Sequence, residues 1–261
     1  MPIIDKYEPQ TIFGENEAEN IEAPRVLMAP NRYIQGQGVL LNLGRYLKVV
    51  PSNQPAILIS ERGRKELGEI INESLSARGI TPTFEIFNGE CSLSEIERIT
   101  NKLVALGKID SLVAVGGGKC VDAGKSVAYR LKLPSIICPS LASNDAPCSA
   151  LSVLYTEEGV SEGAEFFPWS PALVIVDTGI VAKAPVRYLV SGMGDAMATW
   201  YEADTCFRNS KARNTVGARP TLAARAIGEL CANTLFEYGV SSVESVSVSY
   251  THLTLPTNRE V

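Results

Sequence analysis

Three consecutive glycines between an apolar segment and a helical pattern form the stretch of this chain with the most specific chemistry. Residues 112–115 are apolar, as in a strand buried on both faces, and Gly116, Gly117 and Gly118 follow them. Glycines leave backbone N–H groups open to a diphosphate, and a helix over 119–131 points its positive dipole end at the same place. The spacing matches neither the dinucleotide fingerprint nor a Walker loop. A phosphate cradle and a tight strand-to-helix turn are therefore equal alternatives for this stretch taken alone.

Two other polar positions follow apolar, strand-like segments. Residues 139–147 place small hydroxyls, Asn144 and Asp145 between two prolines, and a stiff polar loop at the end of a strand suits ligand binding. A solvated surface loop is the alternative. Glu61 follows the segment 56–60, where it could accept hydrogen bonds from a ribose, or it could be a first-turn acid of the next helix.

Asp195 is the candidate ligand for a metal ion. It opens a predicted helix that is otherwise filled with Ala, Met and Trp, at an expected domain junction. A carboxylate there is a suitable hard ligand for a divalent cation, and a simple helix cap is the alternative. The chain has one histidine, His252, and Asp177 is expected to begin a turn rather than to act chemically.

Alternating apolar and helical patterns predict an α/β fold. The helix 92–106 is expected to begin with a capping box made by Ser92 and Glu95. Such alternation indicates a parallel sheet covered by helices on both faces, with ligands at the carboxyl ends of the strands. Strands are expected over 56–60, 83–87, 111–115 and 135–138, and helices over 65–78, 92–106 and 119–131.

Beyond Pro185 the pattern is helical only, with helices expected over 186–192, 195–207 and 219–238. The predicted organisation therefore has four parts. They are a leader over 1–24, an α/β domain over 25–184, a partial helical domain over 185–246 and an unrelated tail over 247–261.

Composition narrows the class of protein. The chain has 261 residues, a net charge of −5 and a pI near 5.2, which argue against nucleic acid or an anionic membrane as partner. No apolar run approaches the roughly 20 residues that span a bilayer, and residues 1–22 lack the layout of a signal peptide, so a cytoplasmic protein is expected. The six cysteines form no Cys-x-x-Cys pair and are expected to be reduced structural thiols, with Cys148 passive in its loop.

Three motifs in order carry a resemblance to a known family. They are Gly116-Gly-Gly-Lys-x-x-Asp-x-x-Lys125, Pro139-Ser-x-Ala-Ser-x-Asp-Ala-Pro-Cys-Ser-Ala-Leu-Ser-x-x-Tyr155 and Gly192-x-Gly-Asp-Ala-x-Ala-Thr-Trp200. Over residues 25–245 the chain resembles the glycerol dehydrogenases of the iron-type (group III) alcohol dehydrogenase family. The resemblance implies a Rossmann-like parallel-sheet N-terminal domain, an all-helical C-terminal domain, NAD in the cleft between them, and a divalent metal, usually zinc, that coordinates the substrate hydroxyls.

The resemblance also implies roles for individual residues. Glu61 stands where the family commonly has an aspartate for the adenosine ribose, Asp145 matches the residue that contacts glycerol, and Asp195 matches the metal-binding aspartate. The implied NAD contacts are the cradle residues Gly116 and Gly117, the phosphate and ribose contacts Gly118, Lys119 and Asp122, and the pyrophosphate and nicotinamide contacts Ser140, Ser143, Ser149, Leu151 and Tyr155.

The chain departs from the family where the metal is bound. Two histidines that complete the family's metal site are absent, and His252 is not expected to replace them. Residues 247–261 look like translated adaptor sequence joined to a truncated reading frame. A lone Asp195 should bind zinc poorly, because catalytic zinc sites use three protein ligands. The 261-residue chain is therefore expected to have little or no dehydrogenase activity, whereas its full-length parent would be an active homo-oligomer.

Two other functions stay open. One is a related enzyme with another substrate, such as a glycerol-phosphate dehydrogenase or a dehydroquinate-synthase-like lyase. A phosphate-bearing substrate calls for Lys or Arg near Asp145, and residues 139–155 contain none, which favours an uncharged polyol. The other is a nucleotide-binding fragment without catalysis.

Overall fold

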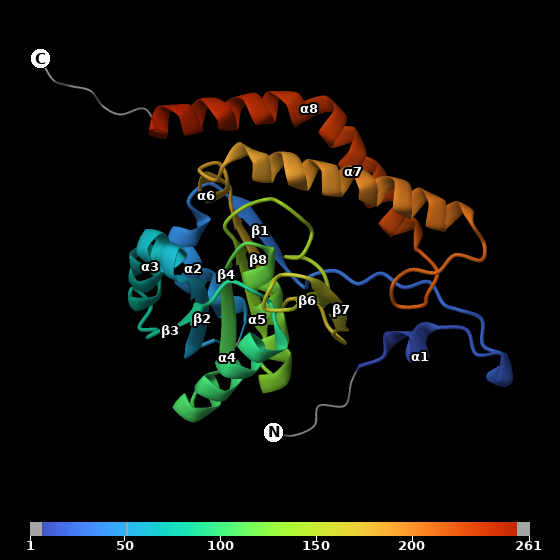
Figure 1. Cartoon of the computed structure of the whole chain (residues 1–261), viewed down its shortest axis with the longest axis horizontal. Coiled ribbons are helices and arrows are strands. Elements are labelled where there is room, and N and C mark those ends of the chain that lie inside the picture. Colours follow the sequence, from blue (N-terminus) through green and yellow to red (C-terminus); the bar gives the residue numbers. More distant parts are fainter. Residues whose placement is uncertain (1–6, 51, 255–261) are drawn as a thin grey trace, which may run out of the picture.

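A parallel sheet forms the centre of the molecule (Figure 1). The computed structural model describes residues 7–50 and 52–254, with side chains up to Ser247. All pairs in the sheet are parallel, and the order β1-β8-β5-β4-β2-β3 confirms the predicted α/β fold. The strands are β1 (Tyr33–Gly36), β2 (Pro55–Ser60), β3 (Thr83–Phe87), β4 (Ser111–Gly116), β5 (Ser135–Pro139) and β8 (Leu173–Asp177).

Alternate side chains of the strands serve two separate hydrophobic layers. Ile57 and Ile59 pack with α2 (Leu43–Tyr46) and α3 (Glu61–Ser76), whereas Ala56 and Leu58 pack with α4 (Leu93–Leu106) and α5 (Gly118–Leu131). All four strand residues are fully buried. Each large side chain so buried stabilises the fold by about 1.5–3 kcal/mol, so the period-2 pattern fixes which face each helix covers.

The helix after the glycine turn lies unusually close to the sheet. A Cβ atom added at Gly124 of α5 would lie 2.5 Å from the Cβ atom of Ala114 on β4. Only a glycine allows this approach, and it holds the N-terminus of α5 at the carboxyl end of β4. The sequence therefore places the helix end, with its free N–H groups, at the edge of the sheet where ligands bind.

The sequence did not predict several of the strands and short helices. The antiparallel hairpin of β6 (Leu151–Tyr155) and β7 (Ser161–Phe166) follows the polar loop, and β7 is largely exposed and lacks apolar alternation. The edge strand β1 is likewise half exposed. Short helical pieces complete the chain: α1 (Pro9–Phe13), α6 (Thr178–Val181) and the 3₁₀ turns Glu17–Glu19, Val39–Asn42 and Leu47–Val49.

Two long helices lie side by side over the sheet (Figure 1). The first, α7 (Val186–Arg208), is one continuous helix, so the predicted break between residues 192 and 195 is wrong. Gly192 is a contact position instead of a helix breaker, because a Cβ atom there would lie 2.3 Å from the carbonyl oxygen of Ala142. The second helix, α8 (Leu222–Thr254), continues beyond its predicted end at Tyr238.

The structure describes the backbone of the first part of the predicted tail over 247–261. The backbone of α8 runs helically to Thr254, although no helical pattern was expected there. Residues 255–261 and the side chain of His252 lie outside the described residues.

The predicted leader packs against the connection between α7 and α8. Arg219 N–H donates to the carbonyl of Pro24, the last leader residue, at 2.7 Å, and the next residue, Arg25, forms a parallel β-bridge with Arg219. Arg213 forms an ion pair with Glu15. The N-terminal segment therefore contacts the helical part of the molecule rather than the sheet alone, and the proposed boundary at residue 184 lies in the link between α6 and α7.

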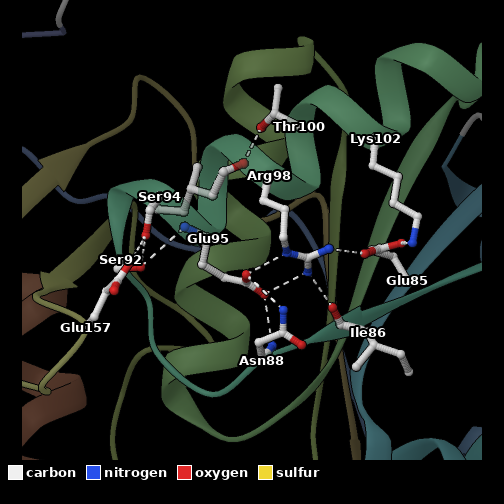
Figure 2. Close-up of polar contacts among 11 residues, drawn as sticks. Glu85, Ile86, Asn88, Ser92, Ser94, Glu95, Arg98, Thr100, Lys102 and Glu157 are labelled. Carbon is white, nitrogen blue, oxygen red and sulfur yellow. Dashed lines mark hydrogen bonds and ion pairs between the residues drawn. The ribbon is translucent and has the colours of Figure 1, made fainter.

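A charge network of two buried carboxylates and the half-buried Arg98 joins α4 to β3 (Figure 2). The Arg98 guanidinium donates to Glu85 at 2.7 Å, to Glu95 at 2.7 and 2.8 Å, and to the Ile86 carbonyl at 2.7 Å. Ser92 Oγ accepts from Glu95 N–H at 3.3 Å, as predicted, but the Glu95 carboxylate binds Arg98 and Asn88 N–H instead of completing a capping box. The network therefore fixes α4 to the segment that follows β3.

The network predicts a loss of stability in acid. Burial alone raises the pKa of Glu95, but hydrogen bonds from Arg98 and Asn88 outweigh it, so the pKa lies below its usual value. The ionised carboxylate thus stabilises the fold above the unfolded pKa of about 4.3, and this contribution disappears as the pH falls through the folded pKa.

Urea unfolding of the wild type and Glu95→Gln between pH 7 and pH 3 measures this contribution. The difference between their free energies of unfolding should be largest at pH 7 and shrink toward pH 3. For the exposed Glu73→Gln the difference should stay small throughout. A Glu95→Gln difference that is constant over this range contradicts the assignment.

Candidate active site

The carboxyl ends of β2, β4 and β5 open into one large cleft. Its volume is about 1170 Å³, and α7 closes its far side through Tyr188 and Asp195. Ten predicted site residues line it: Gly116, Gly117, Gly118, Lys119, Asp122, Ser140, Ser143, Asp145, Tyr155 and Asp195. Residues from all three sequence motifs therefore meet at one place.

The glycine turn has the geometry of an anion cradle. Gly117 is the N-cap of α5, and no side chain caps that helix, so the N–H groups of its first turn are free for a ligand. A Cβ atom at Gly118 would lie 2.5 Å from Asn144 Nδ2, and one at Gly116 would lie 2.7 Å from Cys120 Cβ. The turn therefore has no room for side chains, and its backbone fits a diphosphate.

Lys119 supplies a positive charge at the rim of this cradle. Its Nζ atom lies 2.6 Å from Glu90 Oε1 and 5.1 Å from the centre of the Tyr155 ring. Both residues line the cleft. A phosphate close to the glycine turn would therefore meet a cation and an aromatic surface.

Asp145 and Asp195 meet across the cleft. Asp145 N–H donates to Asp195 Oδ2 at 3.1 Å, and Ser191 Oγ donates to the Ser143 carbonyl at 3.4 Å. Burial and the negative charge of Asp145 raise the pKa of Asp195. The two acids thus form one polar site, although Asp195 lies inside α7 and is exposed, so the prediction that it begins a helix at a buried junction is wrong.

Three of the predicted residues are engaged in contacts within the chain. Asp122 is only 5% exposed; its carboxylate accepts from Val153 N–H at 3.0 Å and pairs with Lys125 Nζ at 2.9 Å. Burial raises the pKa of Asp122, and the Lys125 charge opposes that rise. Ser149 and Leu151 do not line the cleft, and both accept hydrogen bonds from Lys125 Nζ.

Glu61 lies outside the cleft. It is the first residue of α3, its side chain is 75% exposed, and Lys65 Nζ lies 3.5 Å from its carboxylate. The neighbouring Arg62 and Glu66, paired at 2.7 Å, line the cleft in its place. Glu61 is therefore placed as a first-turn acid of α3, which is the alternative that the sequence left open.

The cleft also contains residues that the sequence did not single out. Lys183 comes from the link into α7, and Arg187 and Tyr188 belong to the first turn of α7. Periodicity marked residues 186–192 only as helix, and no local signal connected them with the loop after β5. Only the close packing of α7 on that loop brings them into the site.

Two residues have the passive roles expected of them. Asp177 caps α6, with Oδ1 accepting from Gly179 N–H at 3.0 Å and Ile180 N–H at 3.3 Å. Burial, together with the charge of Asp145, raises the pKa of Cys148, so its thiol is not activated. All six cysteines are free thiols.

Comparison with known proteins identifies the family. The profile described as "Iron-containing alcohol dehydrogenase" matches residues 30–178. The chain belongs to the iron-containing alcohol dehydrogenase family. A glycerol dehydrogenase of Thermotoga maritima is 43% identical over 217 residues, which are 83% of this chain and 58% of that protein. One of Pseudomonas putida is 41% identical over 223 residues, which are 85% of this chain and 60% of that protein.

Solved structures of this family share the fold. The crystal structure of glycerol dehydrogenase from Schizosaccharomyces pombe superimposes with a TM-score of 0.82 at 34% identity, and the match covers 90% of this chain and 58% of that one. The chain therefore spans about three fifths of the length of the curated relatives it matches.

The residues described here do not complete the metal site that the family resemblance implied. Within residues 7–50 and 52–247, no group of three or more His, Cys, Asp or Glu side chains could hold a metal ion. Asp195 and Asp145 are the carboxylates that meet at the cleft. A tight zinc site needs at least one more protein ligand, so these two carboxylates alone do not form one. In the same part of the chain no helix is long and apolar enough to span a bilayer.

Gly192 sets the approach of α7 to the loop that carries Asp145. Alanine is the better helix former by about 1 kcal/mol, but a Cβ atom 2.3 Å from the Ala142 carbonyl forces the helix away at a cost of roughly 1–3 kcal/mol. Gly194 has open space around it. Thermal unfolding should therefore show a lower Tm for Gly192→Ala and a higher Tm for Gly194→Ala. Equal gains in both variants would mean that α7 does not pack on this loop.

Proposed function

We propose that this chain supplies the cofactor-binding part of an NAD-dependent oxidoreductase that oxidises a small polyol, with glycerol as the first candidate. The observation that carries the proposal is the cleft in which the glycine turn, Asp145 and Asp195 meet. Relatives named glycerol dehydrogenase that are 41–43% identical over this part of the chain support it. A divalent metal, with zinc as the first candidate, belongs to the proposal for the whole protein.

In this proposal the cofactor binds to the first of the two predicted domains. Residues 25–184 hold the cofactor: N–H groups of the glycine turn bind its diphosphate, and Lys119 neutralises part of the charge. Ser140 and Ser143 offer hydroxyl groups along the same wall of the cleft. When bound, NAD supplies the hydride acceptor.

The substrate end of the cleft is formed by residues of both parts. Asp145 accepts hydrogen bonds from the hydroxyl groups of the polyol, and Asp195, on α7 within residues 185–246, lies beside it. Together they orient the alcohol carbon relative to the cofactor and displace water from it. Carboxylates accept hydrogen bonds from hydroxyl groups, so two acids suit an uncharged ligand that is rich in hydroxyl groups.

A phosphorylated polyol is the second candidate substrate. Residues 139–155 contain no Lys or Arg that could bind a phosphate, but Lys183 and Arg187 also line the cleft. These two cations could bind a phosphate group. If glycerol phosphate competes for the cleft at lower concentration than glycerol, this candidate takes precedence.

The proposal predicts binding without turnover in this 261-residue chain. NADH fluorescence titration should show saturable binding, because the cradle is complete. Incubation with NAD, glycerol and Zn²⁺ should give no NADH above background, because a third metal ligand is missing among the described residues. Absence of NADH binding would overturn the cofactor assignment. NADH formation that depends on glycerol and stops with a chelator would overturn the assignment of an incomplete metal site.

A further inference from the structure

A buried lysine holds the segment between the polar loop and the hairpin. Lys125 of α5 is 3% exposed, and its ammonium group donates to the Ala146 carbonyl at 2.7 Å, to Ser149 Oγ at 3.0 Å and to the Leu151 carbonyl. An ammonium group has three donors, so one lysine can bind several acceptors at once. One side chain therefore binds three points of the segment 146–151.

Asp122 completes this arrangement from one turn earlier on the same helix. Its carboxylate pairs with Lys125 Nζ at 2.9 Å and accepts from Val153 N–H at 3.0 Å, while its carbonyl accepts from Ser152 Oγ at 2.7 Å. A buried ammonium is stable only when paired, and Asp122 is the carboxylate that pairs with it. We call Lys125, Asp122 and the residues 146–153 bound to them the Lys125 cluster.

The Lys125 cluster determines where the two ends of this segment lie. Asp145 directly precedes Ala146, and its N–H meets Asp195 on α7. Tyr155 follows Val153 by two residues and faces Lys119 in the cleft. The substrate-side acid and the cofactor-side ring are thus both fixed relative to α5, the helix whose N-terminus forms the cradle.

We propose that Lys125 is a positioning residue: its buried ammonium group fixes the segment 146–153 so that Asp145 and Tyr155 lie correctly about the cofactor cleft. Lys125 does not line the cleft, so it acts through the backbone of this segment and not on a ligand. The inference about ligand binding rests on the proposed function, whereas the inference about the segment does not.

Alkylation of individual cysteines tests the structural part independently of any ligand. Cys148 lies within the segment and is half-buried, so Lys125→Met should raise its alkylation rate about 10-fold, measured by mass spectrometry. The half-buried Cys206 on α7 should keep its rate. Global unfolding would instead expose the buried thiols Cys91, Cys120 and Cys138.

Arg130→Met is the matched control on the same helix. Arg130 pairs with Glu165 of β7 at 2.8 Å and so holds the outer strand of the hairpin, away from Asp145. It does not line the cleft, and its removal should leave both the Cys148 rate and the NADH dissociation constant within about twofold of the wild type.

NADH titration of the same variants tests the functional part. Lys125→Met should weaken NADH binding about 10-fold. If it does not fold, Asp122→Asn/Lys125→Met, which leaves no unpaired buried charge, should still show the faster alkylation of Cys148. An unchanged Cys148 rate in a folded variant, or an equal rise in Arg130→Met, overturns the proposal. If the wild type itself does not bind NADH, the proposed function fails, and the Cys148 rates still decide the role of Lys125.

Discussion

Replacing Gly118 by valine is expected to weaken NADH binding by at least about 100-fold, because hydrogen bonds to a charged group contribute about 1.5–3 kcal/mol each and two of them would be lost. A Cβ atom at this position would lie 2.5 Å from Asn144 Nδ2 and would occupy the approach to the free N–H groups of α5. The fold itself should tolerate the change, because the atoms that a Cβ would meet belong to the end of the Asn144 side chain, which can move aside, and valine is no worse a helix former than glycine.

Fluorescence titration with NADH measures this effect, and chemical unfolding of the same variant measures its stability. Gly239→Val on α8 is the matched control, because its nearest neighbour, Met193 Sδ, lies 3.8 Å from the added Cβ position and it does not line the cleft. The control should bind NADH like the wild type. If Gly118→Val binds NADH as tightly as Gly239→Val, the glycine turn is only a tight turn, the alternative that the sequence left open.

The largest loss of stability is expected from Arg98→Met. Removing one partner of a buried ion pair typically costs about 3–5 kcal/mol, since the remaining charge stays buried without compensation. Arg98 is bound to Glu95 and to Glu85, whose side chain is 1% exposed (Figure 2). Lys102 still pairs with Glu85 at 2.7 Å, so Glu95 is the carboxylate left without its cation.

Unfolding in guanidinium chloride measures the free energy of unfolding of Arg98→Met and of the control Arg62→Met. The comparison separates this effect from a general effect of losing an arginine. Arg62 pairs with Glu66 at the surface, with side chains 83% and 55% exposed, and such pairs contribute about 0–1 kcal/mol. A loss below about 1 kcal/mol in Arg98→Met would show that the buried network of α4 and β3 is not important for stability.

The sequence predicted the sheet well because its central strands are buried on both faces. Continuous apolar runs such as 112–115 leave few other structures available, and the helical stripes between them fix the layers. Edge elements were missed for the opposite reason. The hairpin strand β7 is exposed and buries too little apolar surface to leave a pattern.

Long-range contacts explain what could not be predicted in the site. Gly192 and Gly194 looked like a helix break in the sequence. In the structure Gly192 allows contact with the carbonyl group of Ala142, which lies 50 positions earlier in the chain, and Gly194 has open space around it. The same contact brings Arg187 into the cleft and sets Asp195 against Asp145. Local patterns carry no information about such packing.

The most direct test of the cofactor site is a crystal structure of this chain with NAD bound. The diphosphate should lie within hydrogen-bonding distance of the N–H groups at the start of α5, with Asp145 and Asp195 near the nicotinamide end of the same cleft. NAD bound at another place, or with its diphosphate away from the glycine turn, would contradict the account.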